Sequence, residues 1–168
     1  MKKTIWSLLL IACLTLVSAI ASAQATDTSG IASVDVQPAM SLSLVASPDW
    51  GKVTRPPSGT ARFTLNYATG AVTLVSGSAY AFDNGQAGQY TVTGAPSAPV
   101  AFSVSIGAFS GSGISVVASH INGTSSSGNS NLDLTGSLTL NVGGIIDVAS
   151  TATIAVQTAT VTVSVDYQ

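Results

Sequence analysis

Residues 159–167, which read ATVTVSVDY, decide the fold class of this chain. Apolar side chains stand at alternate positions from Val161 to Tyr167, and Thr, Ser and Asp fill the positions between them. Because successive side chains of an extended backbone point to opposite faces, this alternation predicts one face on a core and one face in water. The end of the chain is therefore predicted to be a half-buried β-strand.

The same period-two pattern recurs along the chain, separated by turn-forming residues. It predicts strands at residues 31–36, 39–45, 60–66, 71–75, 88–93, 100–106, 114–121, 132–134, 138–142, 145–148, 151–156 and 159–167. Residues 67–70 are predicted to close a hairpin, and residues 122–131, made mostly of Gly, Ser, Thr and Asn, to form the longest exposed loop. No window has the period of an amphipathic helix. Many short strands with turn signals between them indicate an all-β sandwich or barrel, and we favour a sandwich of two antiparallel sheets.

The predicted strands also predict which side chains face the core. These inward residues are Met40, Leu42, Leu44, Ala61, Phe63, Leu65, Val72, Leu74, Tyr90, Val92, Val100, Phe102, Val104 and Ile106, with Val161, Val163, Val165 and Tyr167 on the last strand. The Thr and Ser side chains between them are predicted to face solvent.

The first 23 residues have the features of a cleavable signal peptide. Lys2 and Lys3 precede an apolar run at residues 5–20, and Ala21 and Ala23 supply the small residues that a signal peptidase requires. A competing interpretation is lipidation at Cys13, although the residues after it do not form a polar tether. We expect cleavage before Gln24, a flexible lead-in at residues 24–30 and a single β-sandwich domain at residues 31–168.

The composition excludes several classes of function. The apolar run of the leader is shorter than a membrane-spanning helix requires, so no transmembrane segment is expected after cleavage. Beyond the leader the chain carries three cations, Lys52, Arg55 and Arg62, against seven Asp and no Glu. Such a sparse positive charge argues against nucleic acid as a partner. The single cysteine, Cys13, lies within the leader, so no disulfide is expected within the mature chain.

Residues that could carry chemistry are few. His120 is the only histidine, and neither a zinc site nor a catalytic triad is built from one histidine without partners. The sequence Asp83-Asn84-Gly85 reads as a turn, because the regularly spaced oxygen ligands of a calcium loop are missing. Asn122-Gly123-Thr124 fits a glycosylation acceptor by chance in an Asn-rich loop. We therefore predict no catalytic, cofactor-binding or metal-binding residues, and no cofactor.

Two further features have a structural and a functional interpretation. Trp50 could stack against a sugar ring, but its position after a strand and a turn favours a cap on the end of the core. The three cations fall within eleven residues and could contact an acidic surface, although solubilising charges that discourage edge pairing are the favoured interpretation.

The order of several segments resembles a known bacterial family. These segments are the strand Leu42-Ser43-Leu44 leading into Trp50-Gly51, residues 59–65, residues 89–94 and residues 160–167. Together with the leader, they resemble the secreted domain-of-unknown-function family numbered four-four-zero-two, over residues 31–167. The resemblance implies a fimbrial-subunit-like, immunoglobulin-like surface β-protein and brings no catalytic residues. The chain departs from it in having Trp50 where Phe is more usual, and in its low-complexity loop.

These observations predict a non-catalytic structural or adhesive protein of the bacterial envelope, secreted to the periplasm or the cell surface, with a pilus-like subunit as one form. Self-association or other envelope proteins are the expected partners. The alternatives are a secreted glycan- or protein-binding module and a hydrolase with an unrecognised site. A donated strand would need alternating apolar residues in a detached segment. Ile31, Val34 and Val36 do not share one register, which counts against strand donation.

Overall fold

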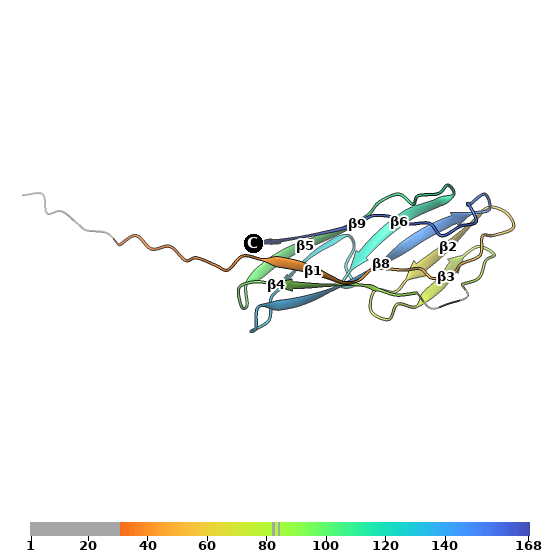
Figure 1. Cartoon of the computed structure of the whole chain (residues 1–168). Helices are drawn as coiled ribbons and strands as arrows, with labels where there is room; N and C mark the ends of the chain where they lie inside the picture. The colour runs from red at the N-terminus through yellow and green to blue at the C-terminus, as the bar shows by residue number, and fades with distance from the viewer. Residues whose placement is uncertain (1–30, 82, 84) are drawn as a thin grey trace, which may run out of the picture. The chain divides into compact units, whose positions relative to one another are not determined.

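The computed structural model describes residues 31–81, 83 and 85–168, and within them the chain is all-β and antiparallel (Figure 1). No helix occurs among these described residues. The strands are β1 (Ser41–Ala46), β2 (Thr60–Leu65), β3 (Val72–Ser76), β4 (Gly88–Thr93), β5 (Pro99–Ile106), β6 (Ile114–Ile121), β7 (Ser127–Asn131), β8 (Ser137–Ala149) and β9 (Val161–Tyr167). All of them belong to the compact unit Val36–Gln168.

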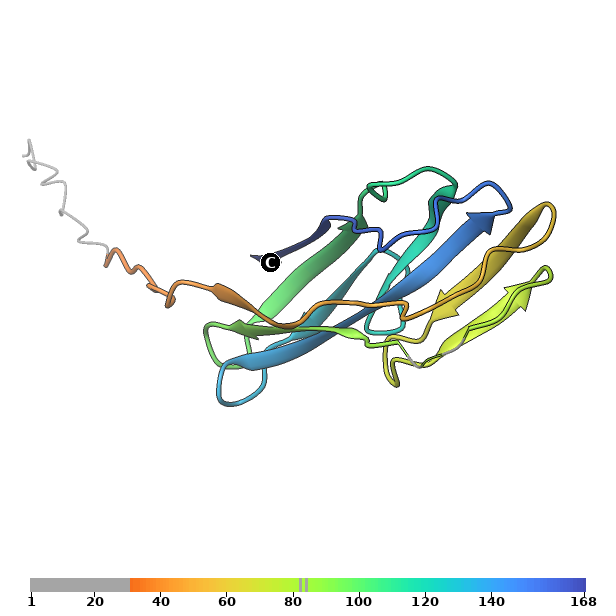
Figure 2. The ribbon, with the colours of Figure 1, turned by 45° about the vertical axis from the view of Figure 1, so that its right-hand side comes forward.

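The larger sheet is built on β8, the long blue strand that crosses Figure 2. Val142 in the middle of β8 lies opposite Gly88 of β4 and Ile121 of β6, so β4 and β6 lie on opposite sides of β8. Further along, Gly144 lies opposite Leu65 of β2 and Ser119 of β6. Strands β4 and β2 therefore follow one another along the same side of β8. β1 pairs with β4 and β3 pairs with β2, which makes both of them edge strands.

The smaller sheet has three strands in the order β7-β5-β9. Its central strand β5 alternates strictly, and Val100, Phe102, Val104 and Ile106 are buried. Phe102 and Val104 lie opposite Val165 and Val163 of β9, so the apolar residues of both strands share one face. This face packs against the larger sheet.

The core consists of two clusters of buried apolar side chains. One cluster joins the two sheets and contains Val92 and Leu140 from the larger sheet and Val100 and Phe102 from the smaller. The other lies toward the opposite end of β8 and contains Trp50, Ala61, Phe63, Leu65, Ala79, Ile106, Ile146, Val148 and Ala152. The all-β, two-sheet arrangement predicted from the alternation is confirmed.

Several predicted strands and core positions are also confirmed. The hairpin at residues 60–75 is present as β2 and β3, and the side chains of Ala61, Phe63 and Leu65 are fully buried. A turn at residues 66–70 connects the two strands, with Asn66 accepting backbone N–H bonds from Ala68 and Thr69 through its side-chain oxygen. Such a side-chain oxygen stabilises a turn by taking the place of a backbone acceptor.

The predicted loop at residues 122–131 is wrong in its second half, because Ser127–Asn131 forms strand β7. The sequence SGNSN has low intrinsic strand propensity, but β7 pairs along β5 from Pro99 to Ser103. Gly128 fits this position because a Cβ atom there would approach the Phe102 ring to 2.9 Å. Tertiary pairing therefore outweighs the local sequence preference.

Three other predicted strands are wrong, because residues 31–36, 132–134 and 151–156 form no strand. Residues 138–142 and 145–148 are strand, as predicted, but they belong to the single strand β8. The strand continues through Gly143 and Gly144, where the absence of a side chain lets neighbouring backbones approach. A Cβ atom at Gly143 would overlap the carbonyl oxygen of Leu65, and one at Gly144 would lie 2.6 Å from that of Ala118. Ile154 and Val156 in the third segment are almost fully exposed.

The predicted signal peptide, residues 1–23, and the predicted lead-in, residues 24–30, lie outside the described residues. Within the described residues, no helix has the length and apolar character needed to cross a membrane.

Candidate functional site

The only histidine, His120, lies on a strand of the larger sheet. His120 is half-buried on β6, opposite Gly143 of β8. The part of the chain that the structure describes contains no group of three or more His, Cys, Asp or Glu side chains that could hold a metal ion. Asp133 instead orders a turn: its Oδ1 accepts hydrogen bonds from the Thr135 hydroxyl and from the backbone N–H groups of Thr135 and Ser137. These bonds, led by the Thr135 hydroxyl, lower the pKa of Asp133.

Each of the three cations has a different partner. Arg62 donates two hydrogen bonds to Asp147, which lies opposite it in the β2–β8 pair, at 2.7 and 2.8 Å. The hydrogen bond from Arg62 holds the pKa of Asp147 below its ordinary value. Lys52 Nζ lies 3.6 Å from Asp83 Oδ2 in an exposed pair. The remaining cation, Arg55, lies 3.5 Å from the carbonyl oxygen of Ala152.

Trp50 is part of the core, as the core-cap interpretation predicts. Its side chain is only 8% exposed and meets Phe109 edge to face, with ring centroids 6.0 Å apart. The ring is therefore not available as an exposed sugar platform. Its Nε1 donor is buried and has no hydrogen-bond partner among the described residues.

On one side of the molecule, a hydrogen-bonded turn connects β6 of the larger sheet to β7 of the smaller sheet. Ile121, the last residue of β6, is fully buried. Asn122, with φ of 47°, donates from Nδ2 to the Thr139 carbonyl and accepts the Asn141 N–H at Oδ1. Asn is one of the few residue types that adopts this left-handed conformation readily. We refer to this side, from Ile121 to Ser127, as the closed edge.

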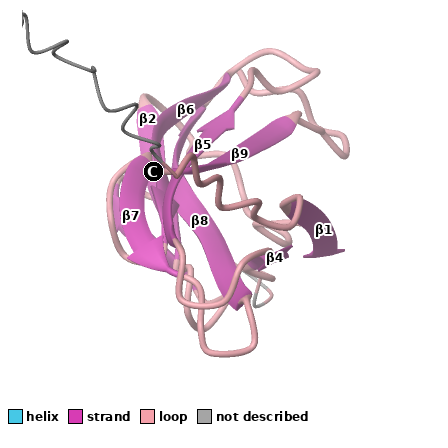
Figure 3. Cartoon of the chain, turned by 90° about the vertical axis from the view of Figure 1, so that its left-hand side faces the viewer, coloured by secondary structure: helices cyan, strands magenta, loops and turns pink. Residues whose placement is uncertain are grey.

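The opposite side, where β1 and β9 are the edge strands, is different. Figure 3 shows β1 and β9 at the ends of their two sheets. Leu42 and Leu44 of β1 lie opposite the buried residues Val92 and Tyr90, so they are on the core-facing side of the larger sheet. Both are nevertheless exposed, Leu44 at 59%. We refer to the side between β1 and β9 as the open edge.

The exposure of these leucines has a simple cause in the strand order. Counted outward from the closed edge, the larger sheet runs β6, β8, β4 and β1, whereas the smaller sheet runs β7, β5 and β9. The smaller sheet therefore has no strand to cover β1. Val161, Val163 and Val165 on β9 are also only half-buried, although their face assignment is as predicted.

One end of the open edge is closed by Tyr167. Its hydroxyl accepts a hydrogen bond from the Ala95 N–H at 2.7 Å and donates one to the Pro38 carbonyl at 3.0 Å. These bonds join the end of β9 to the residues that precede β1. The open edge therefore continues from Tyr167 toward the other ends of the two strands.

At that other end lies a cleft of about 1050 Å³. It is bounded by residues 47–55, which follow β1, and by residues 152–159, which lead toward β9. Apolar side chains line the cleft: Trp50, Val53, Ile106, Phe109, Ile114, Ile146, Val148, Ile154, Val156 and Val161. Lys52 and Arg55, two of the three cations beyond residue 23, also line it.

Two polar atoms of cleft-lining residues have no hydrogen-bond partner within the described part of the chain. They are the Nε1 donor of Trp50 and the Oε1 acceptor of Gln157, and both are buried. A buried polar group without a partner is unfavourable by about 1 to 3 kcal/mol. An occupant of the cleft with both a donor and an acceptor, such as a peptide backbone, matches this pair of groups.

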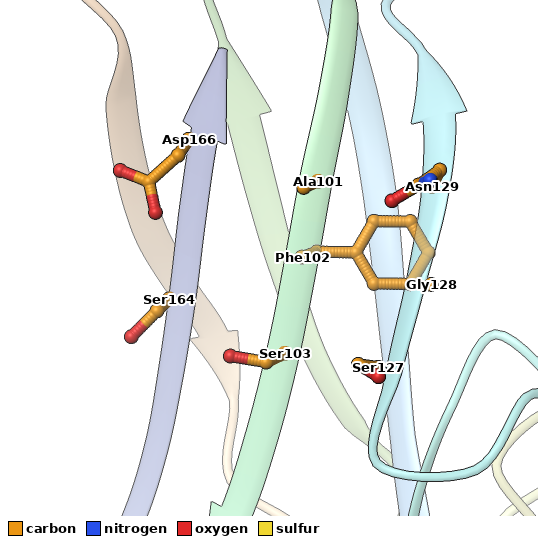
Figure 4. Close-up of a pocket in the computed structure, with 8 residues that line it drawn as sticks. All are labelled: Ala101, Phe102, Ser103, Ser127, Gly128, Asn129, Ser164 and Asp166. Atoms are coloured by element: carbon orange, nitrogen blue, oxygen red, sulfur yellow. The ribbon is translucent and has the colours of Figure 1, made fainter. Parts of the chain in front are cut away.

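A second hollow, of about 390 Å³, lies on the smaller sheet (Figure 4). Short polar side chains from all three strands line it: Ser103 from β5, Ser127 and Asn129 from β7, and Ser164 and Asp166 from β9. With a single carboxylate and no His, Cys or Lys among its lining residues, this hollow lacks an acid–base pair.

Sequence reasoning missed the open edge, although it assigned the faces of β1 and β9 correctly. Alternation identifies the core side of a strand, but it carries no information on whether another strand covers that side. The open edge follows from the uneven number of strands in the two sheets, which is known only once the order of strands in each sheet is known.

The comparisons with known proteins bear on the family. Residues 40–167 match the family described as Domain of unknown function (DUF4402). The chain matches no curated protein and no solved structure. The matched segment begins just before β1 and ends with β9, so it spans every strand described above. The chain therefore belongs to the DUF4402 family of domains of unknown function.

Proposed function

We propose that this chain is a non-catalytic structural or adhesive protein of the bacterial envelope that acts by associating with another protein through its open edge. The observation that carries the proposal is the exposure of Leu42 and Leu44 on the core-facing side of β1. Exposed apolar side chains beside a free strand edge are typical of interaction sites, because uncovered edges otherwise promote aggregation. The cleft of about 1050 Å³ extends this apolar surface beyond the end of the strand.

The proposal includes the type of sandwich and the location of the protein. An immunoglobulin-like sandwich, exported through cleavage before Gln24 to the periplasm or the cell surface, would expose the open edge to other envelope proteins. Intact-mass measurement of the protein from the envelope fraction tests the export step. A mass that starts at Gln24 is expected, whereas a lipidated species that starts at Cys13 would contradict it.

The association itself is tested with a matched pair of variants. Ser43 and Leu44 are adjacent on β1 and both exposed, but their side chains point to opposite faces of the sheet, because each lies in regular register with β4. In the native bacterium, Leu44→Asp should release the protein from the envelope fraction, and Ser43→Asp should leave it there. Circular dichroism of both purified variants checks that each is folded. Equal behaviour of the two folded variants would contradict a role for the open edge.

The two alternatives lack comparable support. Trp50 is buried, which removes the most suitable ring for a sugar-binding module. For a hydrolase, His120 is the only histidine, and Gly143 lies opposite it in the sheet. His120→Ala should leave the protein folded and retained in the envelope. Loss of a hydrolytic activity of the wild type in this variant would overturn the non-catalytic proposal.

A further inference from the structure

The open edge lacks one strand, and the chain itself carries a segment with the pattern of that strand. The smaller sheet ends at β9 and leaves Leu42 and Leu44 of β1 uncovered. A fourth strand beside β9 would lie over β1 and bury both leucines. Such a strand needs small apolar side chains at alternate positions on one face.

Residues 31–37, which precede β1, have this pattern. The structure shows that β1 directs its even-numbered residues, such as Leu42 and Leu44, toward the core side. The same alternation continues backward along the sequence to Val36, Val34 and Ala32. Ile31 is the only large apolar residue of this segment outside the register. The objection that the segment has no common register therefore holds for Ile31 alone.

Residues 31–37 form no strand within their own chain. Val34 and Val36 are more than four-fifths exposed. The side chains of Val34 and Val36 would gain buried area if the segment added as a strand to the edge of a sheet. The open edge offers such a place, because it leaves Leu42 and Leu44 uncovered.

The charges and the unpaired polar groups of the cleft are compatible with the segment before β1 as its occupant. The chain beyond residue 23 has only three cations, and two of them, Lys52 and Arg55, line the cleft. The segment before β1 is acidic, with Asp27 and Asp35 and no cation after Lys3. A peptide backbone also supplies the acceptor and the donor that Trp50 Nε1 and Gln157 Oε1 lack.

We propose, on the basis of the proposed function, that the partner at the open edge is a second copy of this chain, whose residues 31–37 add as a strand to β9. Ala32, Val34 and Val36 of the second copy then cover Leu42 and Leu44 of the first. The donor segment and the acceptor edge are different surfaces of one molecule, so the contact is head-to-tail. Head-to-tail contacts that do not close into a ring produce open chains of subunits.

The test is the mass of the full-length, exported protein in solution, measured by light scattering over a range of concentrations. The wild type should form species whose mass increases with concentration. The donor variant Val34→Asp/Val36→Asp should stay monomeric, while the control Ser33→Asp/Gln37→Asp, which adds the same charge on the other register, should assemble as the wild type does. The acceptor variant Leu44→Asp should also be monomeric, and Ser43→Asp, on the other face of β1, should assemble.

A mixing experiment separates a head-to-tail contact from a symmetric one. The donor variant retains an intact acceptor edge, and the acceptor variant retains an intact segment, so a mixture of the two monomeric variants should form a 1:1 dimer. No dimer on mixing would overturn strand donation. Equal loss of assembly in the donor variant and its control would do the same, since charge alone would then explain the effect.

A wild type that is monomeric at every concentration would also overturn this inference. The proposed function would still stand if that monomer required Leu44, but not Ser43, for retention in the envelope. Loss of both the assembly and this difference in retention would refute the two proposals together.

Discussion

The two outer strands of the three-stranded sheet, β7 and β9, are both edge strands, yet their surroundings differ. β7 has the weaker strand sequence, SGNSN, but it follows a turn in which Asn122 bonds to Thr139 and Asn141 of the larger sheet. β9 has the best alternating pattern of the chain, but its Val161, Val163 and Val165 are only half-buried. The difference shows that a strong alternating pattern identifies a strand but does not determine how far other strands bury its apolar side chains.

The largest effect is expected at the closed edge. Ile121→Ala removes a fully buried side chain and should lower the free energy of unfolding by about 2 to 5 kcal/mol, because the cavity it leaves is lined by core residues. Leu44→Ala, on the open edge, should cost less than about 1 kcal/mol in the monomer, since Leu44 is mostly exposed. Urea unfolding of both variants measures the contrast. Similar losses would mean that the two edges are equally packed.

A smaller effect is expected on β9. Val163→Asp places a charge on the core side of a half-buried strand and should destabilise the protein by about 2 kcal/mol. Thr162→Asp, on the exposed face of the same strand, should stay within about 0.5 kcal/mol of the wild type. Thermal unfolding followed by circular dichroism compares them. If both were tolerated equally, the face assignment of β9 would be wrong.

The smallest effect concerns the Arg62–Asp147 pair, which lies away from both edges. The hydrogen bond from Arg62 lowers the pKa of Asp147 in the folded state. The pair therefore contributes stability at pH values above the unfolded pKa of Asp, about 3.9, and this contribution is lost as the pH falls through the lower folded value. Asp147→Asn should reduce the acid-induced loss of stability without abolishing it, because the pKa of Asp133 is also lowered. An unchanged pH profile of unfolding would contradict this assignment.

Much of the fold was predictable from local pattern. The hairpin of β2 and β3 was found because Ala61, Phe63 and Leu65 alternate with polar residues and a turn sequence follows. The core position of Trp50 was predicted for the same kind of local reason. Period-two alternation determines strand and face whenever the strand is half-buried.

The remaining features depend on contacts between distant segments. β7 forms because β5 pairs with it and Gly128 makes room for the Phe102 ring, neither of which is visible in SGNSN. Residues 31–36 have a strand pattern, but they form no strand in the structure. The open edge became apparent only when the strand order placed four strands opposite three.

Amide hydrogen exchange of β7 and β9, measured in dilute and in concentrated samples of the same protein, tests the central claim most directly. In dilute, monomeric protein, alternate amides of both edge strands should exchange quickly, because each strand has a neighbour on one side only. In concentrated, assembled protein, the β9 amides should become protected while the β7 amides stay unchanged. Protection gained equally at both strands, or at neither, would contradict the claim that the open edge is where a further strand adds.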